Sequence, residues 1–433
     1  MQRGQLRGAR SLLAPLLILT AASSLQAQQP RFETGSRAQQ RVLADAMRQN
    51  SYPLSLQDGV LRGPGFDFLA RRSANAQFVV VGEEHFVKEI PEFLSALFAF
   101  LHEKHGFNYL ALENDPVSAH VASLPPLRGD LQALGRYAQQ YPNAFTFPTD
   151  QELRLIADAG RWSQGKIDPV WGLDQSFGVL HALDRLQALP GFRDTPMFQQ
   201  LHQEALAADT RRPPSGDHPD QLDYMQSVKL ADLEELRRQI DAPEGSEARF
   251  ILDNLVASSQ IYGYYLRSEA GELTRYANGF EREQMMKRLF MRQYHAAEAH
   301  GEHNPKVLLK FGGWHVFRGL GPSQLQTLGN FVTELATANG TDGLTVGVYL
   351  RGSWRDIGKQ KGMEPIAAAT DPSSWTVVDF AALRPAIRAE KFGALDPTLL
   401  SHISGFDVAL VIGGASGATE SLRSQPKPSP PKP

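Results

Sequence analysis

Seven short stretches of the chain are apolar at every position rather than at every second one. Strands that alternate apolar and polar residues have one face in water, whereas continuously apolar strands are typical of a sheet covered on both faces. We therefore expect seven buried strands, separated by polar and helix-favouring segments. They comprise residues 78–81, 109–112, 170–173, 307–309, 344–350, 375–378 and 408–412.

An amphipathic helix separates the first two of these strands. Pro91 suits the first turn of a helix, and an apolar stripe runs from Phe93 to Leu101. A strand, a helix and another strand in close succession form a βαβ unit, in which the two strands run parallel. Because the alternation recurs along the chain, the predicted fold class is α/β, with a central, mostly parallel sheet flanked by helices.

The stretch from about residue 186 to 300 interrupts this alternation. It is charged and favourable to helices, as in residues 234–238 and 280–286, and it contains no strand signal. Residues 211–220 contain two adjacent prolines and a glycine, which predicts a loop. We interpret the whole stretch as a helical insertion that folds against the sheet.

The N-terminal segment has the features of a secretory signal peptide. Three arginines precede a short apolar run at residues 12–19, and small residues lead from that run to Ala27. Cleavage near Ala27 would yield a secreted or periplasmic protein. The apolar run is too short for a stable membrane span, and no later stretch approaches the ~20 apolar residues that a span needs. We therefore expect no membrane span.

These features divide the chain into four parts. Residues 1–27 are the predicted signal peptide, residues 28–74 an N-terminal extension, and residues 75–412 a single α/β domain that includes the insertion. Residues 413–433 begin with small residues and end rich in proline, a composition that cannot bury apolar surface. We expect this last part to be a disordered tail.

Composition excludes several classes of protein. The chain has no cysteine, so disulfides, thiolate-bound zinc, iron–sulfur clusters and cysteine nucleophiles are excluded. Its 44 basic and 47 acidic residues leave a net charge of −3, so no positive field favours nucleic acid. The sequence motifs of serine hydrolases, zincins, Walker loops and dinucleotide-binding folds are absent. We expect a small-molecule or peptide substrate, and the sequence predicts no oligomeric state.

Polar side chains follow four of the predicted strands. They are Glu83, Glu84 and His85 after the first strand, Glu113 after the second, Asp174 after the third and His315 after the fourth. The carboxyl ends of parallel strands lie along one edge of a sheet, where open α/β folds bind ligands. We therefore expect these side chains to share one crevice.

Two of these sites share the sequence motif Gly-x-x-His, at residues 82–85 and 312–315. In each, the glycine would let the chain turn off the strand, so that the histidine points back over the sheet edge. Histidine serves as a general acid or base near neutral pH and is the commonest metal ligand. Glu83 and Glu113 would hold a histidine tautomer, transfer protons or complete a metal shell. The two histidines and Glu113 are therefore the candidate ligands of a divalent metal ion.

These motifs together resemble those of the erythromycin esterase/ChaN-like group, within the superfamily of the Tiki and TraB proteins. The resemblance covers residues 77–318 and rests on Gly-Glu-x-His, a second-strand glutamate, Gly-Leu-Asp-Gln, an Arg-Glu-x-x-Met helix and a final Gly-x-x-His, in the family's order. The first motif is one residue shorter than in erythromycin esterases and has the Tiki and ChaN spacing. This difference argues against a macrolide substrate and leaves a bound metal ion open.

The resemblance implies roles for individual residues. His85 corresponds to the family's essential first-strand histidine, Glu83 to the glutamate before it, Glu113 to the second-strand glutamate and His315 to the last-strand histidine. Arg282 and Glu283 match the Arg-acid pair on the helix before that last strand. Glu84 and Asp174 are secondary candidates, and Asp174 is expected to be a structural partner at its strand end.

The first functional interpretation is an exported hydrolase that cleaves an ester, lactone or amide bond. Water deprotonated by His85 would attack the bond, with Glu83 or Glu113 orienting the imidazole. His315 would act as an acid or second base, and Arg282 would stabilise the developing oxyanion.

Two alternatives within the superfamily stay open. A periplasmic haem- or metal-binding protein of the ChaN type is favoured by the two histidines and the shorter motif, and disfavoured because the chain lacks the cysteine that anchors such lipoproteins. A metal-dependent protease of the Tiki type would use the same residues. The sequence does not determine the cofactor: a divalent metal ion fits the hydrolase and the protease, and haem fits the carrier alone.

Overall fold

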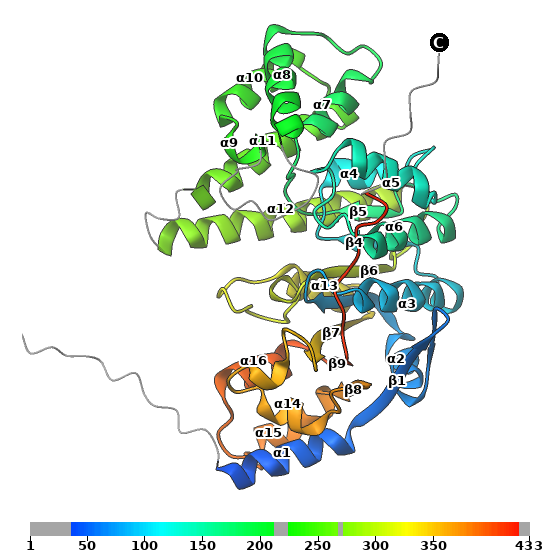
Figure 1. Ribbon diagram of the computed structural model, residues 1–433, viewed down its shortest axis with the longest axis vertical. Coiled ribbons are helices and arrows are strands. Elements are labelled where there is room, and N and C mark those ends of the chain that lie inside the picture. Colours follow the sequence, from blue (N-terminus) through cyan, green and yellow to red (C-terminus); the bar gives the residue numbers. More distant parts are fainter. Residues whose placement is uncertain (1–35, 212–223, 267–271, 424–433) are drawn as a thin grey trace, which may run out of the picture. The chain divides into compact units, whose positions relative to one another are not determined.

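The computed structural model describes residues 36–211, 224–266 and 272–423, within which the strands form a nine-stranded sheet (Figure 1). The strand order is β2-β1-β8-β9-β7-β3-β6-β4-β5. The strands are β1 (Ser51–Gln57), β2 (Val60–Arg62), β3 (Ala76–Glu83), β4 (Tyr109–Leu112), β5 (Val170–Gly172), β6 (Val307–Gly312), β7 (Asp342–Arg351), β8 (Trp375–Asp379) and β9 (Val408–Gly413). All seven predicted strands are therefore present.

The central part of the sheet is parallel. Neighbouring strands run parallel from β9 through β7, β3, β6 and β4 to β5, whereas β8 is antiparallel to both β9 and β1. The predicted α/β class with a mostly parallel sheet is confirmed. One feature of the order was not predictable from the chain: β4 does not pair with β3, because β6 lies between them.

Helices lie on both faces of the sheet. They are α1 (Arg37–Gln49), α2 (Pro64–Ser73), α3 (Glu89–His105), α4 (Pro116–Ala122), α5 (Leu131–Gln140), α6 (Asp150–Trp162), α7 (Leu180–Gln187), α8 (Pro196–Arg211), α9 (Tyr224–Ser227), α10 (Leu230–Ile240), α11 (Glu247–Leu266), α12 (Glu272–Ala299), α13 (Leu328–Ala338), α14 (Glu364–Ala369), α15 (Arg384–Arg388) and α16 (Pro397–Gly405). Three short 3₁₀ helices are η2 (Gly313–His315), η3 (Ile357–Lys359) and η4 (Ala381–Leu383).

The continuously apolar strands are explained by this arrangement. Along β3, Val79 and Val81 belong to the core that includes α3 and α6, and Phe78 and Val80 belong to the core that includes α12 and α13. Every residue of β3 is buried. Because successive side chains point to opposite faces, a strand covered on both faces needs an apolar residue at every position.

The described part of the predicted insertion is helical. It contains α8 to α12, which Figure 1 shows in green, and α11 packs against both α10 and α12. The last of these helices returns to the sheet, where Met286 and Phe290 enter the core that includes β3 and β6. This return brings the Arg282–Glu283 pair of α12 towards the sheet.

The first strand of the sheet lies nearer the N-terminus than the sequence predicts. Strand β1 pairs with β2 and β8, within the segment 28–74 that carried no predicted strand. Its alternation of apolar and polar residues is a strand signal, but Pro53 is unfavourable inside a sheet. The segment also lacks the continuous apolar run of the other strands, which explains why it was missed.

The boundary of the predicted tail at residue 413 lies too early. Residues 414–423 are hydrogen-bonded to the domain: the backbone N–H of Ala418 donates to the carbonyl of Phe86 at 2.9 Å, and the N–H of Leu422 donates to the Asp150 carboxylate at 2.8 Å. A short polar segment can be held by hydrogen bonds without burying apolar surface. The proline-rich residues that follow, and the predicted signal peptide, lie outside the described residues. No helix in the described ranges is long and apolar enough to cross a membrane.

Candidate active site

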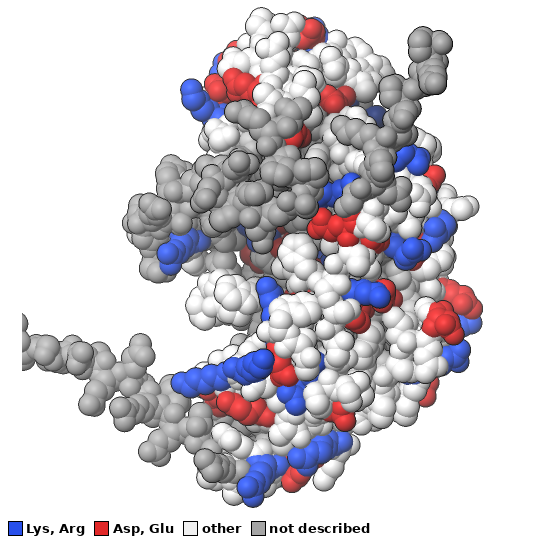
Figure 2. Space-filling model, in the orientation of Figure 1, with Lys and Arg blue, Asp and Glu red and all other residues white. Residues whose placement is uncertain are grey.

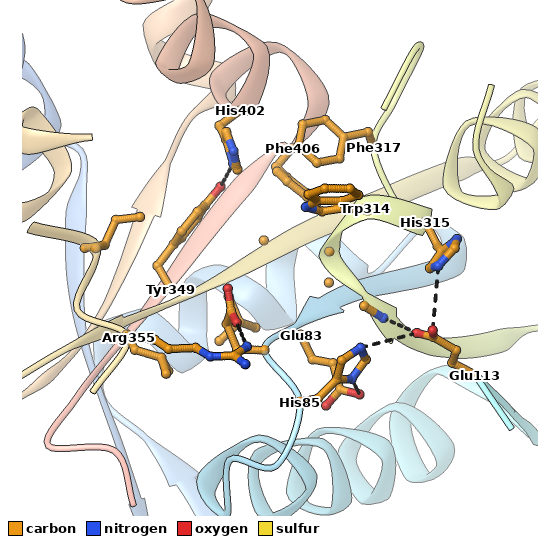
Figure 3. Close-up of a pocket in the computed structure, with 18 of the residues that line it drawn as sticks. Glu83, His85, Glu113, Trp314, His315, Phe317, Tyr349, Arg355, His402 and Phe406 are labelled. Carbon is orange, nitrogen blue, oxygen red and sulfur yellow. Dashed lines mark hydrogen bonds and ion pairs between the residues drawn. The ribbon is translucent and has the colours of Figure 1, made fainter. Parts of the chain in front are cut away.

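The polar ends of four neighbouring strands meet at one edge of the sheet. The strand order places the end of β6 between the ends of β3 and β4, with Glu83 in register with Gly312. A cavity of about 400 Å³ opens there, lined by both Gly-x-x-His motifs, Glu113 and Arg282. The structure thus brings together residues that are far apart in the chain, and Figure 3 shows His85, Glu113 and His315 on the same side of this cavity.

His85 is held by Glu83. Its Nδ1 lies 3.1 Å from Glu83 Oε1, and its ring stacks on Phe147 at a centroid distance of 4.3 Å. An ionised carboxylate only accepts hydrogen bonds, so Nδ1 carries the proton and Nε2 keeps its lone pair. This Nε2 faces Glu113 Oε2 at 3.9 Å. Burial lowers the pKa of His85, but the hydrogen bond and charge of Glu83 outweigh it and raise this pKa above its ordinary value.

A buried lysine that was not among the predicted site residues lies beneath this pair. Lys310, within β6, is only 2% exposed; its Nζ lies 2.5 Å from Glu83 Oε1 and 3.0 Å from Glu152 Oε2. Burial raises the pKa of Glu83, but the charge of Lys310 outweighs it, so this pKa lies below its ordinary value. A lysine inside an otherwise apolar strand run was the signal that could have revealed this network.

Glu113 accepts hydrogen bonds from two directions. The backbone N–H of Gly312 donates to its Oε2 at 2.5 Å, and Arg282 Nη2 donates to its Oε1 at 2.7 Å. His315 Nε2 is also 3.6 Å from Oε1. Burial raises the pKa of Glu113, but its electrostatic interactions with His315 and Arg282 outweigh burial and hold this pKa at about 2. Glu113 is therefore a permanent anion at the base of the cavity.

Arg282 links Glu113 to Asp174. Its Nε donates to Asp174 Oδ1 at 2.7 Å, its Nη2 to Asp174 Oδ2 at 2.5 Å, and its Nη1 to His315 Nε2 at 3.1 Å. A guanidinium has five N–H donors, so these contacts and the one to Glu113 leave one N–H on Nη1. Asp174, just after β5, is fully buried and accepts two hydrogen bonds from this arginine.

His315 is oriented from behind by Glu283. Its Nδ1 lies 2.7 Å from Glu283 Oε1, and the other oxygen of this carboxylate accepts the backbone N–H of Leu328 at 2.8 Å. Because Arg282 can only donate, Nε2 of His315 is the acceptor and Nδ1 carries the proton. In this tautomer His315 has no proton to give towards the cavity, so the geometry does not favour the expected role of His315 as an acid.

The first glycine of each motif is needed because neighbouring side chains pack closely against it, and not because its backbone adopts an unusual conformation. Neither Gly82 nor Gly312 has a positive φ. A Cβ on Gly312 would lie 2.9 Å from His85 Nε2 and 3.1 Å from Glu113 Oε2, and one on Gly82 would lie 2.7 Å from a methyl group of Val316. The interpretation that these glycines permit a sharp turn was therefore wrong, because the absent side chain matters more than the dihedral angle.

Glu84 does not join this group. Its carboxylate pairs with Arg355 at 2.6 Å on the rim of the cavity, where the Arg355 side chain is 50% exposed. A second polar pair, which was not predicted, also lines the cavity: Tyr349 Oη lies 2.7 Å from His402 Nδ1. Tyr349 lies within the apolar run of β7, and His402 lies on a helix. Neither residue belongs to a sequence motif that could have indicated it.

Structural comparison identifies the fold. A succinoglycan biosynthesis protein superimposes with a TM-score of 0.57 and 15% sequence identity, over 89% of this chain and 100% of that chain. A mutant of erythromycin esterase EreC in its open conformation gives 0.55 and 15%, over 85% of this chain and 98% of that one. The chain has the erythromycin esterase fold. A protein from Bacillus cereus gives 0.53 and 14%, over 88% and 98%. No family model matches the chain, and no curated protein matches it by sequence.

The donor set on this erythromycin esterase fold does not suit a divalent metal ion. Of the candidate ligands, Glu113 already accepts bonds from Gly312 and Arg282, and His315 uses both ring nitrogens. The Arg282 guanidinium stands between them, and its charge would repel a cation. The described residues contain no group of three or more side chains placed to hold a metal ion.

The site does not suit haem either. The free nitrogen of His85 is 3.9 Å from Glu113 and lies close to the backbone of Gly312, where there is no room even for a Cβ. A porphyrin ring must lie across the axis of its ligand nitrogen, where it would overlap both of these residues. The residues present therefore fit neither a metal ion nor haem.

Proposed function

We propose that this chain is a hydrolase that cleaves an ester, lactone or amide bond by direct attack of water. The observation that carries this proposal is the state of His85, whose Nδ1–H is held by an anionic Glu83 while Nε2 faces the cavity. A positioned histidine with a free Nε2 is a general base. The described residues that line the cavity include no serine, threonine, cysteine or lysine, which supports water as the nucleophile.

The proposed reaction has two proton transfers, both by His85. Its Nε2 takes a proton from water as the water oxygen bonds to the carbonyl carbon, and the resulting imidazolium is stabilised by the carboxylates of Glu83 and Glu113. The imidazolium then returns the proton to the leaving oxygen or nitrogen as its bond to the carbonyl carbon breaks. The remaining N–H of Arg282 stabilises the oxyanion, and His315 positions that arginine.

A panel of 4-nitrophenyl esters, lactones and anilides, assayed in ¹⁸O-labelled water, tests this proposal. We expect hydrolysis of at least one class, with the label appearing once in the acid product after a single turnover, because water attacks directly. Assays with added haemin or divalent metal salts should show no activation, since the donor set suits neither. If the protein hydrolyses no class of compound faster than buffer alone does, the proposal is contradicted.

The pH dependence of kcat/KM should report the pKa of His85. Only the neutral imidazole accepts a proton, so kcat/KM should fall as pH drops through a pKa that Glu83 holds above its ordinary value. Replacing Glu83→Gln removes the charge that raises this pKa, so the acidic limb should move to lower pH while the plateau falls. Glu84→Gln is the matched control and should leave the limb in place. A limb that does not move in Glu83→Gln would exclude His85 as the group that titrates.

We further propose that the protein is exported. The arginines before a short apolar run, and the small residues up to Ala27, support a cleaved signal peptide. After expression in a bacterium, the mature protein should begin near Gln28 and occur in the periplasmic fraction. Intact-mass measurement of that fraction checks this expectation, and a mature species that still carries Met1 would contradict it.

A further inference from the structure

The cavity has a second side that the proposed reaction does not use. Figure 3 shows Tyr349 and His402 across the cavity from His85 and Glu113. Tyr349 belongs to β7 and His402 to α16, whereas the reactive side is built on β3, β4, β6 and α12. The two sides therefore come from different elements, and a substrate in the cavity would contact both of them.

Most of this second side is apolar. Around Tyr349 and His402 it is lined by Phe317, Leu350, Ile357 and Phe406. The rings form a connected cluster, since His402 lies 5.1 Å from Phe317 and 5.5 Å from Tyr349 between centroids. A ligand group placed here would lose water on most of its surface, which favours an apolar group and disfavours a charged one.

The polar pair on this side is uncharged. Burial lowers the pKa of His402 to about 4 and raises that of Tyr349 well above its ordinary value, so both groups are neutral at physiological pH. Their 2.7 Å contact can be made in two ways. Either the tyrosine O–H donates to Nδ1 and Oη accepts from a ligand, or Nδ1–H donates to Oη and the O–H is free to donate. The pair can thus bond a hydroxyl or a carbonyl oxygen.

A glycine provides the room for the tyrosine hydroxyl. A Cβ on Gly347 would lie 2.9 Å from Tyr349 Oη and 2.9 Å from a ring carbon of Phe406. Charge at the rim is compensated as well, because Arg355 pairs with Glu84 at 2.6 Å. Nothing among the described residues on this side offers an uncompensated charge to a ligand.

We infer that this side of the cavity binds the non-reacting part of the substrate, and that this part is uncharged, largely apolar and carries a hydroxyl or carbonyl oxygen bonded by the Tyr349–His402 pair. The inference rests on the proposed function for the bond that is cleaved, and adds to it the class of substrate: a neutral, hydroxylated or keto-substituted ester, lactone or amide rather than a charged peptide.

Binding of four matched ten-carbon methyl ethers, which contain no bond that the proposed reaction cleaves, to the wild-type protein tests this inference. They differ only in the end group, which is methyl, hydroxyl, ammonium or carboxylate, and titration calorimetry measures each Kd. We expect the hydroxyl ligand to bind tightest and the two charged ligands at least about tenfold more weakly, because an uncompensated charge must be desolvated. Equal affinity of a charged and an uncharged ligand, or no binding of any of the four, would overturn the inference.

The Tyr349→Phe substitution removes the hydroxyl and keeps the ring, so it distinguishes a hydrogen bond to the ligand from packing against it. It should weaken the hydroxyl ligand about threefold to tenfold, the worth of one neutral hydrogen bond, and leave the methyl ligand unchanged. Tyr52→Phe, on β1 near the edge of the sheet and three strands away from β7, is the matched control and should change neither. Equal weakening of all four ligands by Tyr349→Phe would show a packing role alone and overturn the inference.

The outcome is independent of the proposed function, because binding needs no turnover. Hydrolysis of a 4-nitrophenyl ester by the wild type but not by His85→Ala supports the proposed function whatever the ethers show. If His85→Ala retains hydrolysis while the binding preference holds, His85 is not the general base. The inference about the Tyr349–His402 side of the cavity then still stands.

Discussion

Replacing His85→Ala is expected to lower kcat/KM by about two to four orders of magnitude, the usual worth of a positioned general base. The fold should tolerate this change, because the ring lies at a strand end and is 30% exposed. We expect the melting temperature to change by only a few degrees. Steady-state kinetics on the best ester of the panel, together with thermal unfolding, measure both effects.

The companion variants distinguish the base from the groups around it. His315→Ala should cost about 10²-fold or more, because Arg282 loses the acceptor that holds Nη1 in place. Residues that act as a unit are non-additive, so the double variant should be scarcely slower than His85→Ala alone. His300→Ala, an exposed histidine at the end of α12, is the control and should behave as wild type. A sharply lowered melting temperature with intact turnover in His85→Ala would make that histidine a packing residue.

The second large effect should come from the buried cation. Lys310→Met leaves the carboxylates of Glu83 and Glu152 without their partner, and breaking a buried ion pair on one side typically costs about 3–5 kcal/mol of unfolding free energy. Denaturant unfolding, followed by circular dichroism, measures this loss. Lys104→Met, an exposed lysine on α3, is the control and should stay within about 0.5 kcal/mol of wild type.

The pH dependence of this loss has a definite sign. Without Lys310 the two buried carboxylates favour their protonated forms, so their folded-state pKa values lie above the unfolded ones. Such groups bind more protons in the folded state, and stability is lost as pH rises through the folded-state pKa. The cost of Lys310→Met should therefore be larger at pH 8 than at pH 5. Adding Glu152→Leu removes one of the unpaired charges and should restore part of the stability. A Lys310→Met variant as stable as wild type at pH 8 would contradict a buried ionised network.

The state of the partner carboxylates agrees with this expectation. Burial raises the pKa of Glu152, and repulsion by the charge of Glu83 adds to this effect, so that the pKa is about 7 even with Lys310 present. Glu83 is the better anion of the two, since His85 also bonds to it. The lysine therefore serves His85 indirectly, by keeping Glu83 ionised and aimed at Nδ1.

Local pattern in the sequence was enough for seven of the nine strands and for most of the candidate site residues. The strand runs were visible because a sheet covered on both faces demands an apolar residue at every position, as in residues 78–81. The polar residues at the strand ends stood out against those runs, and parallel strands necessarily bring their carboxyl ends to one edge. Glu83, His85, Glu113 and His315 could therefore be grouped before any coordinates were known.

The pairing order and the state of each group were decided by the tertiary structure alone. Insertion of β6 between β3 and β4 joins segments that are distant in the chain, and this choice depends on long-range packing that no local period encodes. The same insertion buries Lys310 beside Glu83, and the return of α12 sets Arg282 against His315, which fixes the histidine tautomers through their neighbours. Tyr349 and His402 meet for the same reason: their contact is made by packing between a strand and a distant helix, and sequence periodicity records only which face a residue occupies, not what it will touch.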